Sequence, residues 1–250
     1  MNLLFTRKAA PAIPASTELL LDGKPVRIAV KLSARARSYR LTVPHHGDPV
    51  LTIPKGGRWP EAQGFLERHR AWLAARVKRA TPQTAFADGE LLPLRGVPHR
   101  IHATGRLRGR VEASEIDGEL CLLVPGEAAH IPRRLTEWLK AEAQRDLAER
   151  SAIHATTLGV VVKSVSMRSQ STRWGSCSST GSLNYNWRLI LAPPHVLDYV
   201  AAHEVAHLVH MNHSAQFWAA VKRALPDMER GKAWLKTHGK VLMGYGLLAG

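Results

Sequence analysis

Hydrophobic and polar residues alternate between residues 18 and 55, the period-two pattern of half-buried β-strands. Apolar residues then recur at helical spacing from about residue 61 to 80, and short strand-like runs return between Leu94 and Val124. We therefore predict a flexible tail at 1–17 and a β-rich N-terminal domain at 18–129 with one helix at about 61–80. No internal repeat is evident. The helical side chains expected to face inward are Phe65, Leu66, Trp72, Leu73 and Val77.

The pattern becomes mainly helical after residue 130. Pro132 begins a predicted helix that runs to about residue 155, and residues 160–167 and 183–191 alternate as strands do. Further helices are predicted after Pro194, after Ser214 and from Met228 to Lys240. The chain is thus expected to be an α+β protein whose second domain covers 130–250.

The sequence His203-Glu204-Val205-Ala206-His207 carries the candidate chemistry. Residues i and i+4 share one face of a helix, so His203 and His207 can hold one metal ion. Glu204 lies one position further round, where it can hold and deprotonate a metal-activated water. This spacing is typical of zinc hydrolases, and it predicts one Zn²⁺ ion with Glu204 as the general base.

Three residues could supply the third ligand. His210 lies on the same helical face but about 10 Å beyond His203 at 1.5 Å per residue, too far along a straight helix. His213 follows Met211-Asn212, and Asn212 is a plausible helix end from which the chain could turn back. Glu229 on a later helix is the third candidate. We favour His213, which leaves the fourth position open for water.

Several motifs resemble one known family. They are Arg173-Trp174-Gly175-Ser176-Cys177, Leu183-Asn184-Tyr185-Asn186-Trp187, Asp198-Tyr199-Val200, the metal motif itself, and Asn212-His213-Ser214-x-x-Phe217-Trp218. In order and spacing the chain resembles the YgjP-like metallopeptidases, predicted metal-dependent hydrolases that are similar to SprT-like zinc proteases. The resemblance implies zinc on His203, His207 and His213, with Glu204 as general base. It also implies a small zincin-like fold, in which the HExxH helix packs on a short sheet whose edge binds extended peptide.

Other residues near the motif are candidates for supporting roles. A peptidase needs a second donor for the oxyanion that develops during hydrolysis, and Tyr199, His210 and Arg173 could supply it. Cys177 could be a fourth metal ligand or a redox group, but a packing thiol is the favoured interpretation.

Composition and charge limit the cellular setting. No stretch of 18 apolar residues occurs, so no membrane span is predicted, and the N-terminus does not resemble a signal peptide. Only two cysteines are present, which fits the reducing cytoplasm. The net charge of +15 includes clusters at 35–40, 68–79 and 100–110 that could contact nucleic acid non-specifically.

Three classes of function are therefore open. The first, which we favour, is a zinc-dependent metallopeptidase acting on a protein or peptide. The second is a metal-dependent hydrolase of a non-peptide substrate such as a nucleotide, although the motif offers no paired carboxylates for phosphate chemistry. The third is a nucleic-acid-associated protein with a structural metal site. An intact Glu204 beside an open coordination position favours the enzymes.

Overall fold

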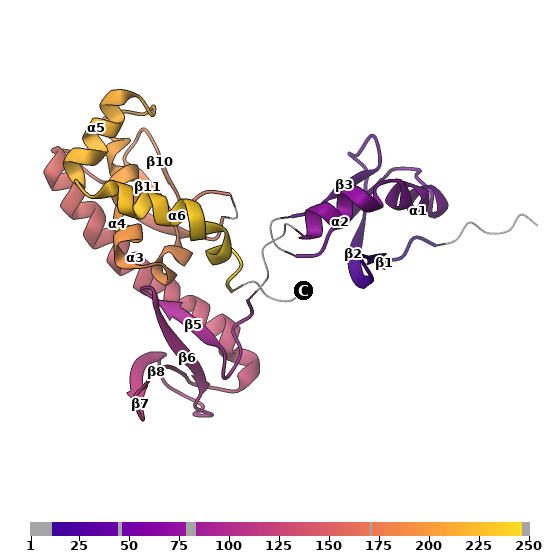
Figure 1. Ribbon diagram of the computed structural model, residues 1–250, viewed down its shortest axis with the longest axis horizontal. Coiled ribbons are helices and arrows are strands. Elements are labelled where there is room, and N and C mark those ends of the chain that lie inside the picture. Colours follow the sequence, from indigo (N-terminus) through magenta and orange to yellow (C-terminus); the bar gives the residue numbers. More distant parts are fainter. Residues whose placement is uncertain (1–11, 45–46, 79–83, 171, 247–250) are drawn as a thin grey trace, which may run out of the picture. The chain divides into compact units, whose positions relative to one another are not determined.

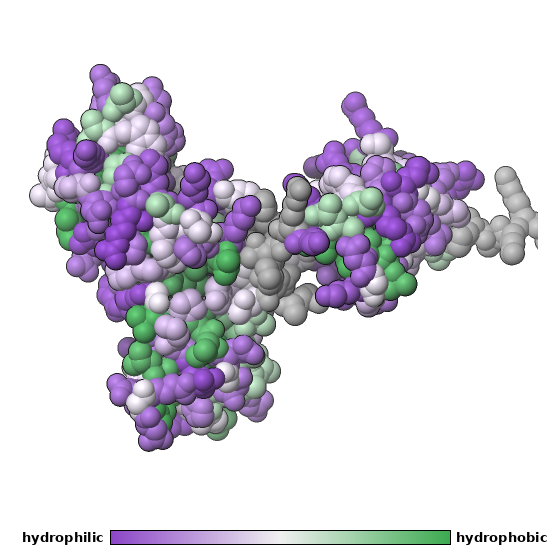
Figure 2. All heavy atoms as spheres, viewed as in Figure 1, coloured by the Kyte–Doolittle hydropathy of each residue, from purple (hydrophilic) through white to green (hydrophobic). Residues whose placement is uncertain are grey.

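The computed structural model describes residues 12–44, 47–78, 84–170 and 172–246 (Figure 1). The chain is an α+β protein that divides into two compact units, one containing the described residues up to 78 and the other those from 84 onward. On the face drawn in Figure 2, both units carry mostly hydrophilic side chains with apolar ones interspersed. No helix in the described segments is long and apolar enough to cross a membrane.

The first unit is a four-stranded sheet followed by two helices. The strands are β1 (Ser16–Leu21), β2 (Lys24–Ser33), β3 (Arg40–Thr42) and β4 (Val50–Pro54), in the order β1-β2-β4-β3. β1–β2 and β3–β4 are antiparallel, whereas β2–β4 is parallel. The expected tail at 1–17 therefore ends earlier, at the start of β1, and its residues 1–11 lie outside the described part of the chain.

The helix expected at about 61–80 is two helices, α1 (Trp59–Arg68) and α2 (Arg70–Lys78). The break is at His69, whose backbone leaves helical geometry and whose Nδ1 donates to the Phe65 carbonyl oxygen at 2.8 Å. This change of direction leaves Trp72 46% exposed, so the prediction that it faces inward is wrong, whereas Leu66 and Leu73 are buried. Residues 79 and 80 lie outside the described part.

The second unit begins with another four-stranded sheet. Its strands are β5 (Leu91–Leu94), β6 (Val97–Ala103), β7 (Glu112–Ile116) and β8 (Glu119–Val124), in the order β5-β6-β8-β7. β5–β6 and β7–β8 are antiparallel and β6–β8 is parallel.

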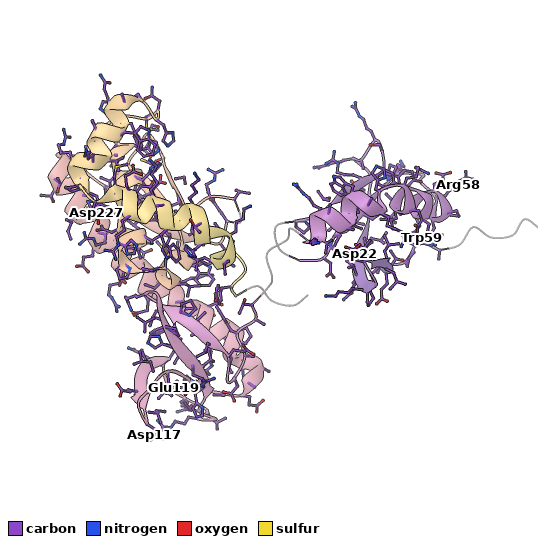
Figure 3. All side chains as sticks on the ribbon, viewed as in Figure 1. Asp22, Arg58, Trp59, Asp117, Glu119 and Asp227 are labelled. Carbon is purple, nitrogen blue, oxygen red and sulfur yellow. The ribbon has the colours of Figure 1, made fainter. Side chains whose placement is uncertain are left out.

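The two four-stranded sheets have the same strand order and the same pattern of parallel and antiparallel pairs, although no repeat is evident in the sequence. Both begin with a hairpin closed by a two-residue turn in the left-handed region, Asp22-Gly23 in the first and Arg95-Gly96 in the second. Both lead into a helix with proline in its first turn. Figure 3 labels Asp22 and also Asp117, which opens a similar turn between β7 and β8. The similarity of the two sheets lies in strand order and turn geometry.

Helix α3 (Ile131–Leu158) connects this sheet to the rest of the second unit. One hydrophobic core includes Leu92 and Leu122 of the sheet, Leu135 and Leu139 of α3, and residues near the C-terminus. The division of the chain therefore falls before β5 and not at the expected 129/130 boundary. Helix α3 packs on the apolar face of this sheet, so the sheet and the helix share one core.

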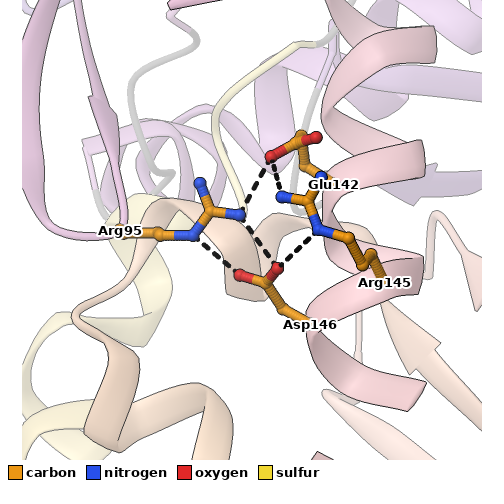
Figure 4. A network of polar contacts seen from close by, with 4 residues as sticks. All are labelled: Arg95, Glu142, Arg145 and Asp146. Carbon is orange, nitrogen blue, oxygen red and sulfur yellow. Dashed lines mark hydrogen bonds and ion pairs between the residues drawn. The ribbon is translucent and has the colours of Figure 1, made fainter. Parts of the chain in front are cut away.

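An ion-pair network also attaches the β5–β6 turn to α3 (Figure 4). Arg95 donates from Nε to Asp146 at 2.7 Å and from Nη2 to Glu142 at 2.9 Å, and Arg145 bonds to both carboxylates. The backbone NH groups of Arg95 and Gly96 donate to the carbonyl oxygens of Ile190 and Leu191, at 2.7 and 3.1 Å. The turn is therefore joined both to α3 and to the segment that precedes the motif helix.

The C-terminal part contains a three-stranded sheet and three helices. The strands are β9 (Ser164–Arg168), β10 (Gly175–Cys177) and β11 (Ser182–Asn186), in the order β10-β11-β9, which makes β10 an edge strand. The helices are α4 (Pro194–Ala206), α5 (Ala215–Ala224) and α6 (Met228–Leu242).

Both strands expected here are shorter than the alternation predicted. Residues 160–163 precede β9, and residues 187–191 form a 3₁₀ helix after β11. Alternation would place Arg188 on a polar face, but its side chain is buried and donates to the Tyr245 carbonyl oxygen at 2.8 Å. The Asn186 side chain caps the 3₁₀ helix by accepting from the Arg188 NH. Burial on every side favours a helical turn over a half-exposed strand.

Candidate metal centre and active site

Helix α4 positions the first two histidines. Pro194 suits its first turn, where a missing NH costs nothing, and the buried residues Val196, Val200 and Val205 fix the helix in the core. Helix α4 ends at Ala206. The next residue, His207, is its C-cap and still has helical backbone angles, so His203 and His207 lie one turn apart on the same face.

The chain reverses immediately after His207, earlier than the expected end at Asn212. The NH groups of Leu208 and Val209 bond to carbonyl oxygens three residues back, which tightens this turn. Ser214 then begins α5, its Oγ accepting from the Phe217 NH at 3.3 Å. The reversal brings His213 back beside the helix.

His203, His207 and His213 lie together as the motif predicts. One ring nitrogen from each lies within 4.8 Å of the others, and the Nε2 atoms of His203 and His213 are 3.1 Å apart. The Nδ1 atom of His207 donates to the His210 carbonyl oxygen at 3.2 Å, leaving Nε2 free to bind an ion. Three converging imidazole nitrogens are a donor set that suits zinc, so these residues fit a bound metal.

Burial favours the neutral form of His203 and His207, which is the form that metals bind. It lowers the pKa of His203 to about 4, with further contributions from His207, His213 and Lys232. Burial also lowers the pKa of His207. Neutral rings do not need to lose a proton before they bind a cation, so burial of His203 and His207 favours metal binding.

Phe217 packs against all three imidazoles. Its ring centroid lies 4.9 Å from that of His203, 4.5 Å from His207 and 4.8 Å from His213. Phe217 is fully buried, so its position is fixed by the core. In the sequence, Phe217 stands out only as part of the motif Asn212-His213-Ser214-x-x-Phe217-Trp218. Its contact with the ligands follows from the chain reversal.

Glu204 lies beside the cluster in a desolvated position. Its side chain is buried, and burial raises its pKa to about 7, partly offset by the positive charge of Arg173. Gly175 of β10 packs directly against it. A Cβ added at Gly175 would lie 2.5 Å from Glu204 Cγ, which is far inside contact distance. The absence of a side chain at residue 175 therefore makes room for the carboxylate.

A pocket of about 290 Å³ opens onto these groups. Among the described residues it is lined by the three histidines and Glu204, by Met211, and by Gly175, Ser176 and Cys177 of strand β10. The edge strand thus forms one wall. Part of the motif Arg173-Trp174-Gly175-Ser176-Cys177 therefore lies at the candidate site.

The remaining candidates lie around this pocket and do not line it. Tyr199 is buried one turn before His203, and burial raises its pKa to about 12. Arg173 is exposed, and its charge acts on Glu204. His210 contributes its carbonyl oxygen to His207. Glu229, the alternative third ligand, is exposed on α6, where Lys232 pairs with it at 3.0 Å.

Cys177 faces the pocket as a half-buried thiol. Its Sγ donates to the Ser178 carbonyl oxygen at 3.3 Å, and it is not part of the group of converging ligand atoms. Burial, together with the charge of Glu204, raises its pKa to about 11. A protonated thiol at neutral pH agrees with the packing role that the sequence favoured.

Asp198 anchors the motif helix to α3. It accepts two hydrogen bonds from Arg150, at 2.6 and 2.7 Å, and one from His154 Nε2 at 2.6 Å. Burial alone would raise the pKa of Asp198, but the hydrogen bonds from His154 and Arg150 outweigh it and lower the pKa. These hydrogen bonds hold α4 against α3 at Asp198, about one turn before His203.

Comparison with protein families matches residues 37–238 to the YgjP-like metallopeptidase domain. The chain belongs to the YgjP-like metallopeptidase family. As a member of this family it is an enzyme, a metal-dependent hydrolase, and the match extends over parts of both compact units. The YgjP-like assignment and the α+β fold agree with the sequence analysis.

A solved structure similar to this YgjP-like chain is that of the metallopeptidase zymogen of Pyrococcus abyssi abylysin. The two share 19% sequence identity, the alignment covers 38% of this chain and 94% of that one, and the TM-score is 0.34. Comparison with curated protein sequences gives no match.

Proposed function

We propose that the chain is a zinc-dependent peptidase in which His203, His207 and His213 hold one Zn²⁺ and Glu204 is the general base. The observation that carries this proposal is the convergence of three imidazoles beside a buried carboxylate. When bound, zinc supplies Lewis acidity, which makes water ionise near neutral pH and polarises a carbonyl.

Glu204 has the properties that a general base needs. A pKa of about 7 allows its carboxylate to accept a proton from water and later to return it to the leaving amine. Gly175 holds the carboxylate in place from one side, and burial excludes competing water. The charge of Arg173 keeps a fraction of the carboxylate ionised at neutral pH.

Strand β10 gives the pocket a wall suited to an extended peptide. As an edge strand it has backbone NH and carbonyl groups on its outer side that can pair with a substrate strand. Tyr199, His210 and Arg173 are the candidate second donors to the oxyanion. We also infer a cytoplasmic location, because Cys121 and Cys177 are both free thiols.

The test is hydrolysis of a casein-type substrate by the purified chain, with and without a chelator, and by Glu204→Gln. We expect chelation to abolish cleavage and zinc to restore it. The Glu204→Gln variant should retain zinc in elemental analysis but lose activity by about 10²–10⁴-fold. Full activity of that variant would refute the base assignment. Turnover of nucleoside triphosphates in place of casein would instead support a non-peptide hydrolase.

A further inference from the structure

Each of the two sheets with shared connectivity carries an arginine-rich segment at the same topological position. Between its second and third strands the first unit has Arg35 and Arg37, with Arg40 at the start of β3. The second unit has Arg106, Arg108 and Arg110 between β6 and β7. We call these segments, residues 35–40 and 106–110, the two arginine loops. The same charge pattern therefore recurs within one chain.

The six guanidinium groups of the arginine loops are exposed. Within the described residues none of them forms an ion pair, whereas Arg58, Arg70, Arg95, Arg100 and Arg150 all do. Three cations on one short segment repel one another unless an anion lies between them. The pattern is thus typical of a surface that receives its counter-charge from a ligand.

The second arginine loop also lines a pocket of about 300 Å³. Arg106, Arg108 and Arg110 all contribute to it, whereas Leu107 between them is 86% exposed. Leu123 and Pro125 supply apolar lining, and Glu112 is the one carboxylate among the described residues that line this pocket. The pocket is larger than a single phosphate needs and combines fixed positive charge with apolar wall.

We propose that each arginine loop binds the phosphodiester backbone of a nucleic-acid strand. Guanidinium groups form paired hydrogen bonds with phosphate oxygens, and a row of three arginines matches a row of regularly spaced phosphates. The apolar lining of the second loop's pocket can accommodate sugar or base. Binding should not depend on the nucleotide sequence, because contacts with the phosphate backbone do not distinguish one base from another. This proposal is independent of the peptidase assignment.

The test measures binding of a fluorescein-labelled 20-nucleotide single-stranded DNA to the full chain by anisotropy at several salt concentrations. The variant Arg106→Ala/Arg108→Ala/Arg110→Ala should bind at least about tenfold more weakly at low salt. Its plot of log affinity against log salt should be shallower by about 2, since each phosphate contact contributes about 0.7 for a single strand. The variant Arg35→Ala/Arg37→Ala/Arg40→Ala should also bind the DNA more weakly, and its affinity should depend less steeply on salt.

A charge-matched control separates this proposal from general attraction to a basic protein. The variant Lys222→Ala/Arg223→Ala/Lys236→Ala removes the same charge from exposed positions on α5 and α6 and should bind within about twofold of the original. Replacing the second loop's arginines by lysine should give intermediate affinity, because lysine keeps the charge but loses the paired geometry. Equal weakening in the control would overturn the proposal. Displacement of DNA by polyglutamate of equal charge would also overturn it and indicate an acidic protein ligand.

Discussion

Gly175 on strand β10 and Glu204 on helix α4 are packed so closely that no side chain fits at residue 175. The contact joins an edge strand to the candidate base across two elements that are far apart in sequence. It therefore couples the position of the carboxylate to the wall of the pocket.

Replacing Gly175 by alanine should displace the Glu204 carboxylate. We expect casein hydrolysis to fall by about 100-fold, because misplacing a catalytic group by about 1 Å has effects of this size. Zinc content should not change, since no imidazole contacts the new methyl group among its nearest neighbours. The control is Gly64→Ala, whose Cβ would meet only an Arg68 nitrogen at 3.4 Å. Normal activity in Gly175→Ala would show that the carboxylate tolerates displacement.

The variant Phe217→Leu should weaken zinc binding. Phe217 touches all three imidazoles, so a smaller side chain lets the rings reorient, and we expect affinity to fall by about 10–100-fold. Competition with a chromophoric chelator measures this directly. Phe86→Leu is the matched control, because Phe86 is buried in the same core but contacts Trp187. An equal loss of affinity in both variants would assign the effect to general destabilisation.

Asp198→Asn should reveal a pH-dependent contribution to stability. The folded-state pKa of Asp198 lies below its unfolded value, so its hydrogen-bonded carboxylate stabilises the fold above about pH 4, and this contribution is lost as the pH falls through the folded pKa. At pH 7 we expect the variant to be less stable by about 2 kcal/mol, less than for a fully buried pair because Arg150 is 35% exposed. Urea unfolding at pH 7 and pH 3 tests this. A difference between the two proteins that stays constant with pH would contradict it.

Gly96→Ala should destabilise the second unit through a specific clash. Gly96 has φ of 79°, and a Cβ there would lie 2.9 Å from Pro193 Cγ. Gly118 has φ of 81° with nothing within 4 Å, so Gly118→Ala measures the backbone strain alone, about 1 kcal/mol. Gly96→Ala should cost about 1–3 kcal/mol more in urea unfolding. Equal losses in the two variants would show that the contact with Pro193 relaxes freely.

Local patterns predicted the features that depend on neighbouring residues. The strands between residues 18 and 55, the helix that begins near Pro132 and the spacing of His203 and His207 all follow from periodicity and proline placement. Convergence of His213 was also expected, although the chain turns at His207 and not at Asn212. Nothing in the local sequence marks that earlier reversal.

Features that depend on tertiary packing were missed. Alternation from 183 to 191 suggested one long strand, but burial of Arg188 on all sides produced a 3₁₀ helix after Asn186. The contact of Gly175 with Glu204 and the repeat of strand order both depend on pairings between distant segments. A domain boundary was expected at 129/130 because the hydrophobic pattern changes there from strand-like to helical. The sheet before this position and the helix after it nevertheless share one core.

All three imidazoles come from residues 203–213, a single short stretch that folds back on itself. An ion bound there would connect residues of one short segment and would not link distant parts of the chain. Metal binding therefore removes little conformational entropy from the unfolded chain. The large core beneath it is assembled from other side chains. Metal supply can therefore switch catalysis on and off while the apoprotein keeps its architecture, and the far-ultraviolet circular dichroism spectrum should be the same before and after chelation.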